Sequence, residues 1–347
     1  MRLLAGPNTG NWTRGSADGI YTDALFSDPY GSSLSSDDSY LLVADYGNHK
    51  IRKIVLSAKA VTTLVGPSHG TTASGSTNGV GTNVRFTEPV GVRLTSDDSF
   101  AFVVESGGHK IRKIITSTLT VTTVAGTTAG TTDGAGTNSK FSFPSDVCFS
   151  SDSSYALITD TGSNRIRKLT LSTSAVVGFA GSNSGVSGST NGIGSNSRFS
   201  GPYGIALAPG GAFALVTDSL NKLIRRIVIT TQAVTTLIGS TTSSGTSDGI
   251  GTSARLYLPA GIAISSDASY AAFVGGSNRL RKLDLTTNAV TTIAGQSLSG
   301  DIDGIGTNAM FKYPISVSIF ADLGWFVVVD QLGNKVKIVA ALGENNF

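Results

Sequence analysis

The stretch Asp133-Gly-Ala-Gly-Thr-Asn-Ser-Lys-Phe-Ser-Phe-Pro144 recurs six times along the chain in closely related forms. Each copy of this signature stretch begins with Asp or Asn followed by Gly, and leads to an apolar residue with a proline three positions later. The copies begin at Asp18, Asn78, Asp133, Asn191, Asp248 and Asp303. Successive copies lie 55 to 60 residues apart, and self-similarity at this period indicates stacked repeats. We therefore expect residues 1–347 to form a single domain of six repeats.

The residues after each signature stretch predict four short strands. In the second repeat, residues 90–94 alternate apolar and small side chains, which is the period of a strand. A turn rich in Ser and Asp follows, then a second strand at 100–104 that is almost wholly apolar. A third strand begins at Lys110, and a fourth ends at Gly126. Short strands separated by turn signals favour an antiparallel meander, and six four-stranded sheets around an axis make a β-propeller.

The two ends of the chain predict how the ring closes. The sixth repeat has a third strand at 335–340, and the chain then ends without a recognisable fourth strand. Residues 2–6, Arg-Leu-Leu-Ala-Gly, resemble the end of the fourth strand of the second repeat at 122–126. We expect this N-terminal strand to complete the last blade, because closure removes the exposed edges of an open array. The predicted fold class is an all-β, six-bladed propeller.

Composition limits the functional classes. Charged residues make up 14% of the chain and the net charge is +3, which argues against a partner bound mainly through a nucleic-acid backbone. The single cysteine, Cys148, allows no internal disulfide and lies in an apolar run, so we expect it to be buried. We expect no membrane insertion, because no apolar run approaches about 20 residues.

Location is predicted from weaker indications. A neutral surface rich in Gly, Ser and Thr is common in secreted and cell-surface proteins, and Asn11-Trp-Thr13 is an N-glycosylation sequon. No signal peptide is visible. We therefore expect a glycoprotein domain, with Asn11 as the glycosylated residue, within a larger extracellular or cell-surface protein.

The repeats resemble a known family. The pattern Phe-x-x-Pro-x-Gly, an apolar strand ending in Asp and then Gly-Asn-His-Lys-Ile-Arg-Lys-Ile is similar to the NHL repeat, most clearly at Val43–Ile54. The resemblance covers essentially the whole chain. It implies a six-bladed propeller, but the family includes extracellular adhesion and sensor domains, RNA-binding propellers of ubiquitin-ligase proteins and a metal-dependent amidating lyase. The fold therefore does not choose the activity.

An acidic residue ends the second strand in five of the six repeats. These residues are Asp45, Glu105, Asp160, Asp218 and Asp330. The resemblance implies that they lie at one mouth of the central channel, where they could bind a cation or a polar ligand. Alternatively, each acid caps its own turn and pairs with a third-strand arginine such as Arg52, since a residue repeated in each blade usually serves the blade. The fifth repeat lacks the acid and is one residue shorter, at Phe273-Val-Gly-Gly-Ser277.

Two residues depart from the repeat near the predicted axis. Asp146 stands where four other copies have Gly and one has Ser, and Arg93 stands where the others have Ser, Cys or Ala. Both lie on first strands of adjacent blades. We expect them to form an ion pair or to line a ligand site, so the candidate ligand-binding residues are Arg93, Asp146 and the five second-strand acids.

Catalytic chemistry has little support in the sequence. The lyase of this family needs clustered histidines for its metal, as the resemblance implies, whereas His49, His69 and His109 are scattered. The chain has no Gly-x-Ser-x-Gly elbow and no Cys/His nucleophile pair. The Asp-Gly-x-Gly loops could suggest calcium, but each offers one or two carboxylates, and a tight turn is the favoured interpretation. We predict no catalytic residue, no metal ligand and no cofactor.

The sequence thus favours a non-catalytic interaction module that binds a protein or a glycan through loops on one face. One alternative is a metal-dependent lyase or hydrolase site at the channel mouth. A second is an RNA-binding propeller, in which Tyr residues would stack on bases and a basic rim would contact phosphates. The candidates for those roles are Tyr30, Tyr203, Tyr257, Arg85, Lys140, Arg198 and Arg255.

Overall fold

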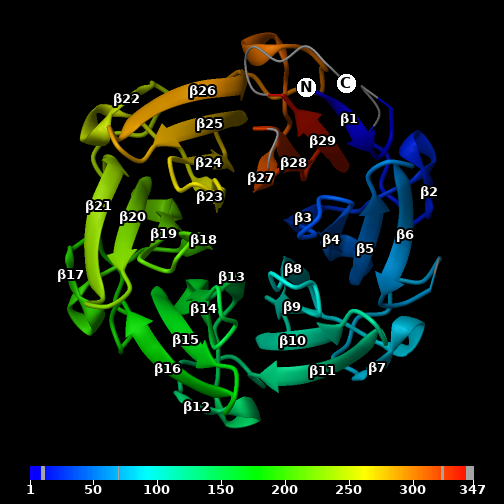
Figure 1. Cartoon of the computed structure of the whole chain (residues 1–347), viewed down its shortest axis with the longest axis horizontal. Coiled ribbons are helices and arrows are strands. Elements are labelled where there is room, and N and C mark those ends of the chain that lie inside the picture. The colour runs from blue at the N-terminus through cyan, green and yellow to red at the C-terminus, as the bar shows by residue number, and fades with distance from the viewer. Residues whose placement is uncertain (9–11, 69, 322–323, 341–347) are drawn as a thin grey trace.

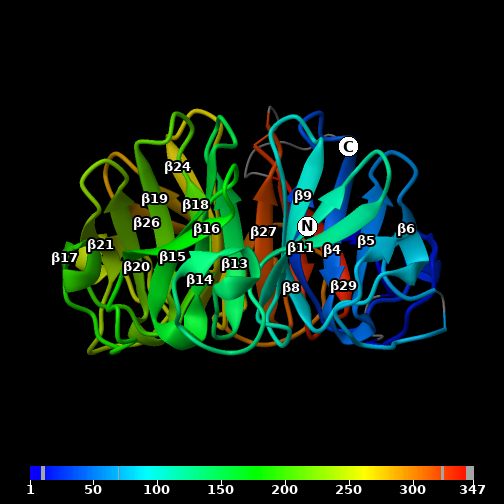
Figure 2. The same ribbon diagram turned by 90° about the horizontal axis from the view of Figure 1, so that it is seen from below.

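The computed structural model describes residues 1–8, 12–68, 70–321 and 324–340. Its described residues form six antiparallel sheets, arranged as blades around a central axis (Figure 1). Seen from the side, the strands run along the axis and the connecting loops gather at its two ends (Figure 2). The predicted six-bladed propeller is confirmed. Asn11 and His69 lie outside the described residues, so glycosylation at Asn11 stays a prediction.

Each blade contains the four predicted strands, from the axis outward. The innermost strands are β3 (Pro29–Leu34), β8 (Pro89–Leu94), β13 (Pro144–Phe149), β18 (Pro202–Leu207), β23 (Pro259–Ile264) and β27 (Pro314–Ile319). The second strands are β4 (Tyr40–Asp45), β9 (Phe100–Glu105), β14 (Tyr155–Asp160), β19 (Phe213–Asp218), β24 (Tyr270–Gly275) and β28 (Phe326–Asp330). The third strands are β5 (Lys50–Val55), β10 (Lys110–Ile115), β15 (Arg165–Thr170), β20 (Leu223–Val228), β25 (Arg279–Asp284) and β29 (Lys335–Val339). The fourth strands are β6 (Ala60–Val65), β11 (Thr120–Ala125), β16 (Ala175–Ala180), β21 (Ala233–Gly239), β26 (Ala289–Gly295) and β1 (Arg2–Ala5).

Five blades carry a fifth strand that the sequence did not predict. It is a two-residue strand formed by the start of the signature stretch, and in the first blade Gly19 pairs with Val61. These outer strands are β2 (Gly19–Ile20), β7 (Gly79–Val80), β12 (Gly134–Ala135), β17 (Gly192–Ile193) and β22 (Gly249–Ile250). Short 3-10 helices follow the signature Gly-x pairs: η1 (Tyr21–Asp23), η3 (Gly81–Asn83), η4 (Gly136–Asn138), η6 (Gly194–Asn196), η8 (Gly251–Ser253) and η9 (Gly306–Asn308). A strand of only two residues is too short to show an alternation of apolar and polar side chains, so the sequence does not predict it.

The N-terminal strand closes the ring as predicted. β1 pairs antiparallel with β29, with Arg2 opposite Ile338 and Leu3 opposite Lys337. The last blade therefore combines residues from both ends of the chain. At its outer edge the main-chain N–H of Gly304 donates to the Met1 oxygen at 3.2 Å.

The core lies between neighbouring blades. Between the first two blades, Leu42 and Ile51 pack with Phe86 and Val92 in one buried cluster. The signature apolar residues are at most 1% exposed: Phe26, Phe86, Phe141, Phe199, Leu256 and Phe311.

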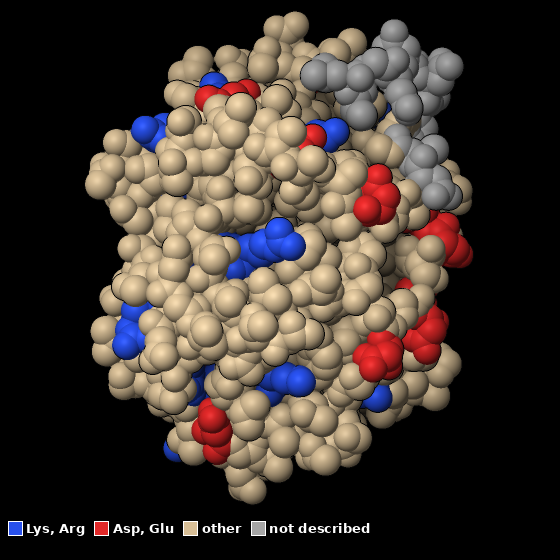
Figure 3. All heavy atoms as spheres, turned by 60° about the vertical axis from the view of Figure 1, so that its left-hand side comes forward, with Lys and Arg blue, Asp and Glu red and all other residues tan. Residues whose placement is uncertain are grey.

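Charged side chains are scattered over the side of the molecule shown in Figure 3. Among the described helices, none has the length and apolar character needed to span a bilayer.

Candidate functional site

The second-strand acids belong to a cluster that recurs inside the blades. In the first blade, Arg52 is fully buried, and its Nη1 donates to Asp45 Oδ2 at 2.8 Å. Its Nη2 donates to Asp18 Oδ1 at 2.7 Å, and the guanidinium also donates to the carbonyls of Leu25 and Ala17. The ring of Phe26 lies 5.2 Å from it. We call this arrangement of third-strand arginine, second-strand acid and signature Asp or Asn the blade ion cluster.

A β-bulge accompanies the blade ion cluster. In the first blade the pairing of β5 with β6 shifts between Ile51 and Arg52, and the same shift recurs at the equivalent residue of the other blades. A bulge increases the local twist and redirects a side chain, and here it stands where the arginine turns into the blade. The first residue of the signature stretch therefore has a structural role, since it binds this arginine.

The next three blades repeat the cluster with small changes. Glu105 accepts from Arg112 at 2.8 Å, and the equivalent contacts of Asp160 with Arg167 and Asp218 with Arg225 measure 3.1 and 2.9 Å. The remaining acid, Asp330, accepts main-chain N–H groups of Lys312 and Tyr313 at 2.9 and 2.7 Å. All five acids are fully buried: Asp45, Glu105, Asp160, Asp218 and Asp330.

Burial is the main cause of the raised pKa of these acids. It raises the pKa of the Asp45 carboxyl, against the opposing effect of Arg52, and it raises the pKa of Glu105 to about 6 in the same way. These contacts favour the interpretation in which each acid serves its own blade. A ligand-binding role for the five acids stays a prediction.

The fifth blade shows how the cluster adapts when its acid is missing. Gly275 takes the register of the acid, opposite Pro259. A Cβ at this position would lie 2.3 Å from the Leu258 oxygen, so the backbone leaves no room for a side chain. Arg281 instead directs both Nε and Nη2 to Asp248 Oδ1, at 3.2 and 2.8 Å.

Two histidines and three arginines of the predicted basic rim also have structural contacts. The Nδ1 atoms of His49 and His109 accept the main-chain N–H groups of Glu88 and Phe143 in the next blade, each at 3.2 Å. Arg85 donates to the carbonyls of Thr82 and Val84 beside η3, and Arg198 and Arg255 do the same at their own 3-10 helices. Within the described ranges, no three His, Cys, Asp or Glu side chains gather as a metal ion would require.

Arg93 and Asp146 do meet near the axis. Arg93 Nη2 lies 3.9 Å from Asp146 Oδ2, across the boundary between the second and third blades. The carboxylate is held by main-chain groups, since Oδ1 accepts from Val147 at 2.8 Å and Oδ2 from Ile205 at 3.1 Å. Burial raises the pKa of Asp146, and the cation of Arg93 opposes this. The sequence therefore placed these two residues together correctly, whereas their role toward a ligand stays a prediction.

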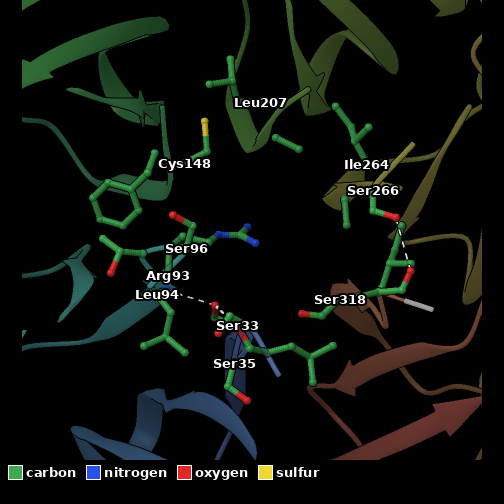
Figure 4. Close-up of a pocket in the computed structure, with 18 of the residues that line it drawn as sticks. Ser33, Ser35, Arg93, Leu94, Ser96, Cys148, Leu207, Ile264, Ser266 and Ser318 are labelled. Atoms are coloured by element: carbon green, nitrogen blue, oxygen red, sulfur yellow. Dashed lines mark hydrogen bonds between the residues drawn. The ribbon is translucent and has the colours of Figure 1, made fainter. Parts of the chain in front are cut away.

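One end of the channel opens into a cavity of about 390 Å³, which we call the funnel. It lies where the innermost strands end and the Ser- and Asp-rich turns begin. Its lining includes Ser33, Cys148 and Ser318, with the guanidinium of Arg93 directed toward the opening (Figure 4). Deeper in the channel a recess of about 20 Å³ lies between Arg93, Asp146 and Tyr203. The sequence did not predict the funnel, because its turn residues read as local turn formers.

The opposite end of the channel carries the tyrosine cluster: Tyr30, Tyr46, Tyr203, Tyr257 and Tyr313. Tyr30 and Tyr46 pack with ring centroids 4.9 Å apart, and the Tyr203 phenol is in electrostatic reach of Tyr30, Tyr46 and Tyr313. Burial raises the pKa of Tyr30, Tyr203 and Tyr313, and it raises the pKa of Tyr46 to about 12, so these four phenols are uncharged at neutral pH. Sequence reasoning noted Tyr30, Tyr203 and Tyr257 but did not recognise the cluster.

Exposed apolar residues surround the tyrosine cluster. Phe143 directly precedes β13 and is 54% exposed, with its ring edge-on to His109 at 4.7 Å. Leu220 lies in η7 (Ser219–Asn221) at the same end and is 61% exposed. Leu332 follows β28 there and is also exposed, and the ring of Trp12 lies 3.4 Å from the Lys312 ammonium. This end of the channel therefore exposes several apolar and aromatic side chains.

Comparison with known proteins supports the family resemblance. Protein SUPPRESSOR OF QUENCHING 1, chloroplastic, from Arabidopsis thaliana is 29% identical over 297 residues, which make up 82% of this chain and 28% of that protein. NHL repeat-containing protein 2 from Bos taurus is 30% identical over 163 residues, 45% of this chain and 22% of that protein. The chain thus spans less than a third of the length of these two curated relatives. No protein-family model matches it.

Solved structures share the fold. An auxiliary nutrient binding protein from Bacteroides thetaiotaomicron superposes with a TM-score of 0.72, covering 97% of this chain and 75% of that one at 14% sequence identity. Likeness at this identity concerns the architecture alone. The six signature repeats, the closed ring of six blades and the relatives named for NHL repeats identify this chain as an NHL-repeat β-propeller.

Proposed function

We propose that this propeller is a non-catalytic binding module, and that it docks a protein partner on the tyrosine end of its channel. The observation that carries the proposal is the concentration of aromatic and apolar side chains there. Five of the nine tyrosines of the chain lie at this end, together with exposed Phe143 and Leu220. Exposed apolar patches of this kind mark interaction surfaces, and Tyr is enriched among the residues that dominate binding energy.

Two tyrosines of the cluster are held in place before any partner arrives. Tyr30 is fixed by its contact with Tyr46 and by a hydrogen bond with Gln331, and the Tyr46 phenol bonds Glu88. Side chains that are already ordered lose little rotamer freedom on association, so more of the contact energy appears as affinity. The rigid blades beneath support the same conclusion.

A protein fits this surface better than a glycan does. Leu220, Leu332 and Phe143 offer no hydrogen-bonding groups, and burying them against sugar hydroxyls would leave those hydroxyls unpaired. Apolar side chains of a protein partner carry no such penalty. The two curated relatives support a module within a longer chain, because the matching region is a minor part of each. An extracellular location for this chain stays a prediction.

The test compares the proteins labelled by proximity biotinylation around the wild-type propeller and around a triple variant. The variant Phe143→Asp, Leu220→Gly, Tyr257→Ser places at the first two positions residues that other blades carry, Asp28 and Gly47. Ala263→Leu at the funnel serves as the matched control. We expect a partner that the triple variant loses and the control keeps, with at least a tenfold loss of affinity in direct binding.

Two results would overturn this proposal. The first is a direct partner whose affinity the triple variant leaves unchanged. The second is binding of the purified propeller to a glycan array that depends on the same three residues, which would replace the protein partner with a carbohydrate.

A further inference from the structure

The strongest unexplained feature outside the tyrosine end is the arginine in the funnel. In the blade ion cluster, Arg52 donates to four acceptors, two of them carboxylates. Arg93 differs. Among the described residues, its guanidinium makes one hydrogen bond, from Nε to the Val147 oxygen at 3.3 Å, and one ion pair at 3.9 Å. An arginine has five N–H donors, so most of those on Arg93 have no acceptor in the part of the chain that the structure describes.

The fold does not require Arg93. At the same register the other innermost strands have Ser33, Cys148, Ala206, Ala263 and Ser318. Asp146 has partners other than Arg93, because each of its oxygens accepts a main-chain N–H. The side chain is 24% exposed and points into the funnel (Figure 4). A cation with spare donors at the base of a cavity is a site for an anion, and a planar guanidinium matches a carboxylate.

The residues that line the funnel indicate the chemical character of the rest of the ligand. An apolar ring lies around the cavity, formed by Leu34, Leu94, Phe149, Leu207, Ile264 and Ile319. The volume of about 390 Å³ is within the range of small-molecule pockets. Asp38 lies on the rim, and the adjoining turns carry ionised acids such as Asp97, whose hydroxyl partners lower its pKa to about 2. A negative rim opposes ligands with several negative charges.

We propose that the funnel binds a small monocarboxylate with an apolar body, whose carboxylate pairs with Arg93. The Arg93–Asp146 ion pair is then a competitor that the ligand partly replaces. This site is separate from the tyrosine end, and its existence does not depend on the docking proposed above.

The probe is 4-phenylbutanoate, measured by isothermal titration calorimetry against two matched compounds. The uncharged 4-phenylbutanamide tests the charge, and 4-phenylbutyl phosphate tests the head group. We expect binding of the carboxylate, with the amide and the phosphate weaker by about tenfold or more.

Three variants test the residues, and the repeat itself supplies them. Arg93→Ser installs the residue of two other blades, and Asp146→Gly that of four others. Arg93→Ser is expected to weaken the binding of 4-phenylbutanoate at least about tenfold and to leave the binding of the amide unchanged. The double variant is expected to behave likewise. Asp146→Gly is expected to raise the affinity for 4-phenylbutanoate several-fold, because it removes the carboxylate that competes for Arg93. Melting curves of the double variant, which has residues of other blades at both positions, control for folding.

Several outcomes overturn the proposal. They are no measurable binding of 4-phenylbutanoate at millimolar concentration, equal binding of the amide, and tighter binding of the phosphate. Equal affinity of wild type and Arg93→Ser also overturns it, as does weaker binding by Asp146→Gly in a protein that melts like the wild type.

Discussion

The two ends of the channel are built by the same repeat, but the pKa values of their acidic residues are shifted in opposite directions. At the funnel end, Asp97 is exposed and accepts hydroxyl and main-chain hydrogen bonds from its own turn, which lower its pKa to about 2. At the tyrosine end, Glu105 is buried beside Arg112, and burial raises its pKa to about 6. The position of an acid in the repeat therefore decides its behaviour. The tyrosine end rests on buried ion clusters, whereas the funnel end carries exposed acids in its turns.

The largest effect is expected from breaking a blade ion cluster. Arg225→Leu leaves Asp218 buried without its cation, and we expect it to lower the free energy of unfolding by about 3–5 kcal/mol. Arg281→Leu is the matched control, because its blade lacks the second-strand acid and its partner Asp248 is partly exposed. We expect that variant to lose about 1–2 kcal/mol in the same denaturant titration. Equal losses would contradict a special role for the buried acid.

A second change tests the blade without the acid. Gly275→Ala adds a Cβ that would meet the Leu258 oxygen at 2.3 Å, so the strand must move. We expect a loss of about 1–3 kcal/mol, measured by chemical unfolding. Gly210→Ala, in an exposed turn where an added Cβ meets no atom within 4 Å, controls for the glycine change alone, though its φ of +80° adds a small strain of its own. A neutral result at Gly275 would mean that the acid is absent there for another reason.

A third prediction concerns pH at the tyrosine end. The Glu105 carboxyl has a pKa of about 6 when folded and 4.5 as its ordinary value, so the folded state holds this proton more tightly. The contribution of this carboxyl to the free energy of unfolding is complete below pH 4.5. It is lost as the pH rises through 6, and amounts to about 2 kcal/mol in all. Glu105→Gln should remove that fall from the curve of unfolding free energy against pH. A curve parallel to wild type between pH 4.5 and 7 would refute it.

The smallest effect is expected at the funnel end, with the opposite sign. The pKa of Asp97 is lowered from 3.8 to about 2, so its contribution is present above pH 3.8 and is lost as the pH falls toward 2. Asp97→Asn should reduce the acid-side loss of stability, followed by melting temperature between pH 4 and 2. Three other turns carry the same acid, so the change is partial: Asp37, Asp152 and Asp267. An unchanged acid limb would contradict the assignment.

Local and repeated features were predictable, whereas features assembled across blades were not. The closing strand was readable because residues 2–6 end as other fourth strands do, and Arg93 and Asp146 stood out because they break a pattern. The tyrosine cluster combines Tyr30, Tyr203 and Tyr313, which are far apart in the sequence and meet only when the ring closes. The funnel is formed by the turns of several blades together, so the sequence of a single turn does not predict it.

The pairing of β1 with β29 has a consequence for the order of folding. Residue 2 cannot reach its partner at residue 338 until nearly the whole chain has left the ribosome. Until then Leu3 and Leu4, both buried in the finished ring, lack their final cover. Contacts between such distant residues form slowly, because the chain between them must first be ordered. A circular permutant in which β1 follows β29 directly should therefore complete its last blade sooner than the natural order does.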